Sequence, residues 1–240
     1  TIVVPISGVK PFPGDGLDEV KLIRVTLIER EKLLRSRTRF PLGTHKEFLT
    51  KSGGKNNTFE SAKMFAVLRF TGTLKEVRPK CLKLIDQELA IFSVCRIGQK
   101  RQSWGPIGVV GQHSDAFVGH AFLDPTSKRA SMRHERIQGG MPLLLADFWK
   151  DYQKHSFFPK LLRILRGETP VTSGWQDDLR RASILIGRSY NCSDVPTAFL
   201  FQMIALEALL TRQGDKYTED LPERIKAFLG WTGLWDSEKF

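Results

Sequence analysis

The hydrophobic pattern of the chain changes its period near residues 137–140, and this change limits the folds that are available. Before it, short segments rich in β-branched residues alternate with turns that contain Gly and Pro, which is typical of strands. After it, apolar residues recur at helical spacing over longer segments. We therefore predict an α+β protein with a β-rich N-terminal domain over residues 1–138 and an α-helical bundle over residues 141–240.

The two predicted parts contain several recognisable elements. In the first part, strands are expected within residues 21–34, 64–73, 88–97, 107–110 and 116–123. In the second part, helices are expected over residues 141–152, 158–166, 175–190 and 195–211, with a further helix beginning near Asp220. Asp194 is a suitable N-cap for the fourth of these helices, and Pro196 fits its first turn.

Positive charge is concentrated in the first part of the chain. Residues 1–140 contain 24 Lys and Arg against 13 Asp and Glu, whereas residues 141–240 contain 13 of each, so the whole net charge of +11 lies in the first part. Such a local basic field attracts polyanions. We predict RNA contacts from two arginine clusters, of which the first would form a stripe along an extended strand: Arg35, Arg37 and Arg39, then Arg129 and Arg133. A basic surface that only aids solubility is the alternative.

Several classes of protein do not fit the sequence. It has no run of about 18 apolar residues, as a membrane span requires, and no signal-peptide pattern at its start. Its three cysteines lack zinc-ligand spacing and are interpreted as reduced thiols, which predicts a cytoplasmic location. No phosphate-binding loop or dinucleotide fingerprint occurs. We expect no metal and no cofactor, and we expect the sequence to be the ordered part of a longer chain.

Glu207 is the one charged residue within an apolar segment that runs from Ala198 to Leu210. A carboxylate among apolar neighbours must be paired, protonated or at the mouth of a cleft. One interpretation is a buried ion pair with Arg180, Arg181 or Arg188 of the preceding helix. The other is a catalytic or interface carboxylate.

The same region carries a family resemblance. The segment from Phe199 to Leu210 contains the run ALEALL, and the segment from Glu223 to Gly230 reads ERIKAFLG. Together they resemble the helical domain of the ApeA-like HEPN family, over about residues 141–240. The resemblance implies a metal-independent ribonuclease that is usually dimeric and often serves in bacterial antiphage or toxin-type defence.

The resemblance also implies an active pair of Arg and His, four to six residues apart, near the start of a final helix. His would transfer protons and Arg would stabilise the charge that develops on the phosphate. No such pair follows Gly230, and the motif would begin beyond Phe240. Two upstream pairs have suitable spacing but lie outside the helical part: Arg39 with His45, and Arg129 with His134.

Two functions follow as hypotheses. The first is a defence endoribonuclease whose basic N-terminal domain binds or senses a ligand and whose trigger or inhibitor is another protein. The second is a non-catalytic RNA-binding or sensor module. In both, the helical domain forms a homodimer. A DNA-binding regulator ranks below them because the basic part shows no helix-turn-helix pattern.

Overall fold

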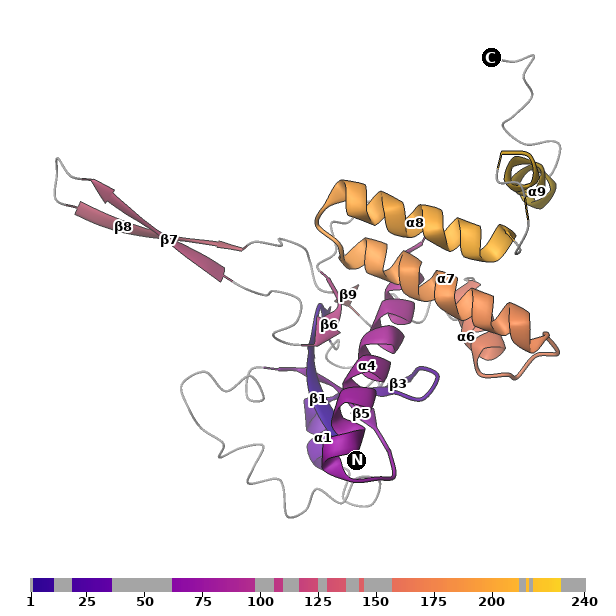
Figure 1. Cartoon of the computed structure of the whole chain (residues 1–240). Helices are drawn as coiled ribbons and strands as arrows, with labels where there is room; N and C mark the ends of the chain where they lie inside the picture. The colour runs from indigo at the N-terminus through magenta and orange to yellow at the C-terminus, as the bar shows by residue number, and fades with distance from the viewer. Residues whose placement is uncertain are drawn as a thin grey trace.

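The fold combines an antiparallel sheet with a set of α-helices. The computed structural model describes residues 2–10, 19–35, 62–97, 106–109, 117–124, 129–136, 143–144, 157–211, 215 and 218–229. A five-stranded sheet near the N-terminus is followed by helices, so the chain is α+β (Figure 1). None of the helices within these ranges is long and apolar enough to cross a lipid bilayer.

The main sheet has the strand order β3-β4-β5-β1-β6, and every neighbouring pair is antiparallel. Its central strand β5 is buried along its whole length, so both faces of the sheet are covered there. Strand β3 lies at one edge. The bounds of the strands are β1 Ile2–Ser7, β3 Glu19–Lys21, β4 Thr26–Glu29, β5 Met64–Leu68 and β6 Gly108–Val109.

Helix α4 (Leu74–Ser93) covers one face of this sheet, and a 3₁₀ turn over Val94–Arg96 follows it. Its buried residues Val77, Cys81, Ile85 and Leu89 recur every fourth position, which places them on one face of the helix. The strand predicted over 88–97 is therefore wrong. A short apolar run fits a buried strand and a buried helix equally well, and the helical spacing becomes visible only when the preceding two turns are included.

A shorter helix, α1 (Arg30–Arg35), packs on the opposite face of the sheet. It follows β4 directly, and its Leu33 packs with Ile28, Phe65 and Val67 in a second hydrophobic cluster. Strand β4 and the last residue of β3 confirm the strands predicted within residues 21–34, but residues 30–35 are helical, so the extended conformation assumed for the arginine stripe is wrong over the described part of that stripe. Residues 36–39 lie outside the described ranges.

Among the described residues of the C-terminal part, three helices pack in sequence and a fourth follows. They are α6 (Phe157–Leu165), α7 (Ser173–Asn191), α8 (Val195–Leu210) and α9 (Asp220–Leu229). Figure 1 shows α8 lying along α7, and α7 crossing α4. The predicted helices over 158–166, 175–190 and 195–211 are confirmed to within a few residues at each end.

Two further small sheets complete the described chain. Strands β7 (Phe117–Asp124) and β8 (Arg129–Arg136) form an antiparallel hairpin that extends away from the helices (Figure 1). Strand β2 (Val9–Lys10) pairs in parallel with β9 (Leu143–Leu144). The helix predicted over 141–152 is wrong at the two residues of β9, which pair with β2 at the other end of the sequence.

One hydrophobic core joins the two predicted parts. Its main cluster contains residues of the sheet and α4 together with Phe158, Leu161, Leu162 and Leu165 of α6. The rings of Phe92 and Phe158 meet edge to face, with centroids 6.1 Å apart. The described parts on either side of residue 140 therefore bury apolar surface against each other.

Helices α4 and α7 approach each other closely at Gly187. A Cβ atom built on Gly187 of α7 would lie 1.7 Å from the carbonyl oxygen of Ala90 in α4. The end of α7 is tied to the residue before β6, Ile107, by the side chain of Asn191. Its Oδ1 accepts the N–H of Ile107 at 3.0 Å, and its Nδ2 donates to the Ile107 carbonyl at 2.9 Å.

Candidate functional site

Helix α8 begins at a well-formed N-cap. The Oδ2 atom of Asp194 accepts the backbone N–H of Thr197 at 3.0 Å and also accepts the Thr197 hydroxyl. Pro196 lies in the first turn, where its missing N–H costs no hydrogen bond. The predicted N-cap is therefore confirmed. These two donors from Thr197 hold the pKa of the Asp194 carboxyl below its usual value.

We expect Asp194→Ala to lower the melting temperature at pH 7, because α8 loses its capping acceptor. A carboxyl whose pKa is lowered in the folded state stabilises the protein above the unfolded pKa of about 3.9. That contribution is lost as the pH falls through the lowered folded value. The melting-temperature difference from wild type should therefore shrink at acidic pH. Asp194→Asn keeps an acceptor and is the control; equal melting temperatures for all three proteins at pH 7 would contradict the capping role.

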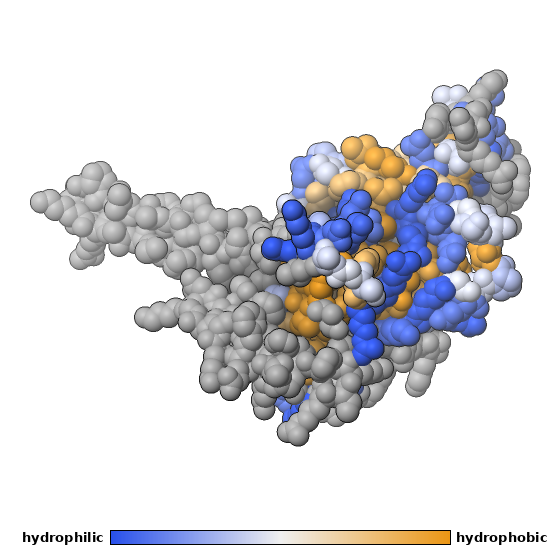
Figure 2. All heavy atoms as spheres, turned by 60° about the horizontal axis from the view of Figure 1, so that its bottom comes forward, coloured by the Kyte–Doolittle hydropathy of each residue, from blue (hydrophilic) through white to orange (hydrophobic). Residues whose placement is uncertain are grey.

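The outer face of α8 is unusually apolar for a surface helix. Of its residues only Ala205 is fully buried. Val195 is 76% exposed, Phe199 61% and Leu200 55%. Met203, Ile204 and Leu206 are also exposed, and the spacing of these residues places them along the side of α8 that α7 leaves uncovered. We call these six residues the α8 face. Figure 2 likewise shows hydrophobic side chains at the surface, between hydrophilic ones.

Glu207 is half-buried near the end of α8. Its main-chain carbonyl accepts the N–H and the hydroxyl of Thr211, which closes the helix. Of the arginines predicted as its partners, Arg188 pairs with Asp86 of α4 at 3.1 Å and Arg180 donates to the carbonyl of Leu165. Glu207 follows Leu206 of the α8 face in the sequence and therefore lies beside that face. Its catalytic role stays a prediction.

Beneath the start of α8 lies a hollow of about 490 Å³. The Arg188–Asp86 ion pair lies on one wall and Phe201 on another, so the lining is partly apolar and partly charged. Cys192 lies at the rim with a free thiol. Within the described residues no three His, Cys, Asp or Glu side chains come together as a metal site.

The predicted RNA-binding arginines are spread over different elements. Arg35 ends α1 and pairs with Glu31 of the same helix at 3.0 Å, so the predicted strand-borne stripe is wrong at this residue. Arg37 and Arg39 lie outside the described residues. Arg129 and Arg133 lie on β8, opposite Asp124 and His120 of β7 in the strand register. Their part in RNA binding stays a prediction.

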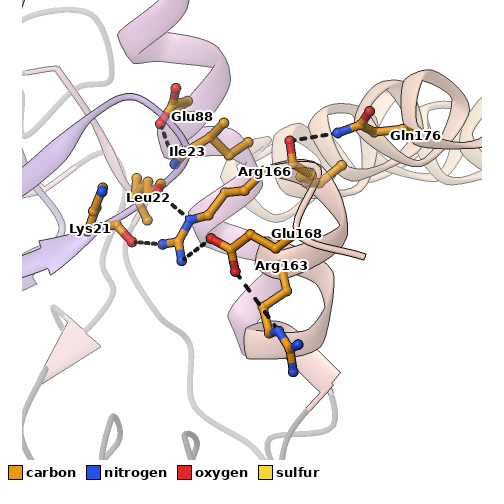
Figure 3. Close-up of polar contacts among 9 residues, drawn as sticks. Lys21, Leu22, Ile23, Glu88, Arg163, Arg166, Glu168 and Gln176 are labelled. Carbon is orange, nitrogen blue, oxygen red and sulfur yellow. Dashed lines mark hydrogen bonds and ion pairs between the residues drawn. The ribbon is translucent and has the colours of Figure 1, made fainter. Parts of the chain in front are cut away.

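A second arrangement, which the sequence did not indicate, is centred on the turn between β3 and β4 (Figure 3). The carboxylate of Glu88, which is 1% exposed, accepts the backbone N–H groups of Ile23, Arg24 and Val25 at 2.9–3.0 Å. Burial raises the pKa of Glu88, and the three donors act in the opposite direction. One side chain of α4 thus satisfies three donors of a surface turn.

The same turn is held from its other side by Arg166, the residue after α6. Its Nε atom donates to the carbonyl of Leu22 at 3.0 Å, and its Nη2 atom donates to the carbonyl of Lys21. Glu168 lies 3.7 Å from the Arg166 guanidinium (Figure 3). We call this arrangement the turn clasp. It fixes the edge of the sheet to α4 and to the end of α6 through main-chain atoms of the turn.

Comparison with known proteins adds no assignment. No family model matches the chain, and neither a curated protein nor a solved structure gives a significant match. The resemblance to the ApeA-like HEPN family therefore stays a prediction from the motifs in the sequence.

Proposed function

We propose that this chain is an RNA-binding protein that works as a homodimer, with the two copies joined through the α8 face. The observation that carries the proposal is the exposure of the six apolar residues of that face. Large contiguous apolar patches on a soluble surface mark interaction sites. The concentration of positive charge in residues 1–140 supports RNA as the ligand.

A second copy of the chain is the partner that fits the α8 face best. Glu207 is the one charged residue between Val195 and Leu210, so the face offers almost no charge for a partner to match. In a two-fold symmetric contact the same patch covers itself, and two such helices can bury each other's apolar side chains. A face of this kind needs a partner that is equally apolar, and the α8 face of another copy is one.

The basic surface that supports RNA binding includes α4. Lys75, Arg78, Lys80 and Lys83 are exposed on the first half of this helix, close in sequence to the turn clasp at Glu88. Cations at a surface bind phosphates mainly by releasing counterions, with little dependence on base sequence. This supports RNA contact through the backbone, with the helical part providing the dimer.

RNA cleavage, which the family resemblance implies, stays a prediction, as does a restraining or triggering partner protein. No His follows His155 in the sequence, so helices α6 to α9 contain none. A cleaving pair of Arg and His would have to draw its His from another part of the protein. The proposal therefore assigns binding and assembly to this chain.

Replacing Phe199 by Asp tests the dimer. The substitution places a charge in the centre of the α8 face, where it would be buried without a partner in the dimer. We expect wild type to sediment as a dimer at micromolar concentration, and Phe199→Asp to dissociate at least about 100-fold more readily. Phe70→Asp, at an exposed Phe of the sheet region, is the matched control and should remain dimeric. A monomeric wild type, or a dimer insensitive to Phe199→Asp, would refute the proposed contact.

A further inference from the structure

A groove of about 470 Å³ opens at the edge of the main sheet, beside the turn clasp. Its floor is made by strands β3, β4 and β5 and by the residues that follow β5, and α4 supplies one wall. Its size falls within the range of about 300–1,000 Å³ that is usual for ligand sites. The lining residues are Glu19, Lys21, Arg24, Thr26, Val67, Leu68, Arg69, Phe70 and Leu84.

The groove has an excess of positive charge. Among the described residues that line it, Lys21, Arg24 and Arg69 have exposed side chains, and Glu19 is the one acidic residue. These cations come from three separate places, the end of β3, the β3–β4 turn and the end of β5. Strands β3 and β5 lie on either side of β4, so Lys21 and Arg69 line the groove from opposite sides of that strand and can contact one anion together.

The turn clasp holds the main chain of two of these cations, Lys21 and Arg24, without using their charged groups. Glu88 binds the backbone N–H of Arg24, and Arg166 binds the backbone carbonyl of Lys21. Residues Lys80, Leu84 and Glu88 follow one another at intervals of one helical turn, so they lie along one side of α4. Leu84 lines the groove and Glu88 binds the turn, which places the exposed Lys80 at the next position along the same wall.

The groove also has an aromatic side chain at its surface. Phe70 is 44% exposed although it follows the fully buried strand β5. Val67, Leu68 and Leu84 add apolar lining. A half-exposed aromatic ring next to several cations is the combination with which proteins bind single-stranded nucleic acid, because the ring stacks on a base while the cations hold the backbone.

We infer that this groove binds a nucleotide of single-stranded RNA, with its phosphate near Lys21, Arg24 and Arg69 and its base against Phe70. The inference rests on the proposed RNA binding and specifies which surface does it and which form of RNA is bound. A single strand is required because the base faces of a duplex are stacked on one another and cannot reach Phe70.

The test is a titration of the full chain with fluorescently labelled single-stranded RNA of about 12 nucleotides, read by anisotropy at several salt concentrations. We expect Phe70→Ala to weaken binding about ten-fold at every salt concentration. Lys21→Ser, Arg24→Ser and Arg69→Ser should each weaken binding and reduce the slope of log K against log salt by about 0.7.

Matched controls lie on other elements. Phe157→Ala removes a Phe of similar exposure, 40%, at the start of α6, and Lys226→Ser removes an exposed cation of α9. Neither should change the affinity by more than about two-fold. Circular dichroism of each variant shows that the fold is retained, which is expected because the clasp uses only the main chain of Lys21 and Arg24.

The outcomes separate this inference from the proposed function. If wild type binds the oligonucleotide and the groove variants bind equally well, RNA binding stands and the groove is the wrong surface. If wild type does not bind it at all, the proposed function itself fails. Titration with AMP and with an RNA duplex completes the test, since tight binding of AMP alone, or a preference for duplex, would overturn single-stranded RNA as the occupant.

Discussion

Gly187→Ala is expected to destabilise the protein by about 2–3 kcal/mol, although alanine is the better helix former. The added methyl group would lie 1.7 Å from the carbonyl oxygen of Ala90, so α4 and α7 would have to move apart along their crossing. Main-chain atoms of a helix cannot turn away as a side chain can. The core that joins the sheet to the helices would then pack less closely. Urea unfolding followed by circular dichroism measures the change.

Gly174 provides a matched control in the same helix. A Cβ atom added there meets nothing within 4 Å, so Gly174→Ala gains helix propensity without a clash. We expect it to be neutral or to stabilise the protein by up to about 1 kcal/mol. If the two variants had the same unfolding midpoint, the close contact between α4 and α7 would be refuted.

Glu88→Ala is expected to cost about 3–5 kcal/mol, because three hydrogen bonds to a charged acceptor are lost together. It removes the acceptor of the N–H groups of Ile23, Arg24 and Val25, and at least that of Val25 is buried and would lose its partner. The turn between β3 and β4 would lose its attachment to α4, and the basic groove would lose one of its supports. The free energy of unfolding from urea titration is the measurement.

Two variants control for this result. Glu88→Gln keeps one carbonyl oxygen but turns an amide N–H₂ toward the same donors, so we expect an intermediate loss of stability. Glu76→Ala removes an exposed carboxylate that accepts the hydroxyl of the N-cap residue Thr73 of the same helix, and it should cost about 1 kcal/mol or less. Equal stability of Glu88→Ala and Glu76→Ala would show that the turn does not depend on Glu88.

Local signals predicted the C-terminal helices well. The Asp194 cap, the proline after it and the regular apolar spacing of α7 act over a few residues, so they can be recognised in one sequence. Strand β5 was also predicted, because a β-branched apolar run bounded by turn residues is itself a local pattern.

The errors came from features that depend on distant parts of the chain. The second half of α4 has the composition of a buried strand because it is buried against both the sheet and α7, and burial removes the polar face that would mark a surface helix. Strand β9 forms because β2 pairs with it from the other end of the sequence.

The α8 face, the turn clasp and the groove also depend on residues that are distant in the sequence. The composition of α8 correctly predicted an apolar helix but not its exposure, since only the arrangement of α7 determines which side stays uncovered. Glu88 was predicted to begin a strand, and its role appears only when the β3–β4 turn is placed beside it. The groove cations come from positions 21, 24 and 69, so no contiguous motif connects them.

The most direct test of the proposed RNA-binding homodimer is the mass of the wild-type chain eluting with the single-stranded oligonucleotide, measured by light scattering with absorbance at two wavelengths. The account predicts a particle that contains two chains of 27.3 kDa together with bound RNA. A particle containing one chain, or two chains that elute without RNA, would contradict it.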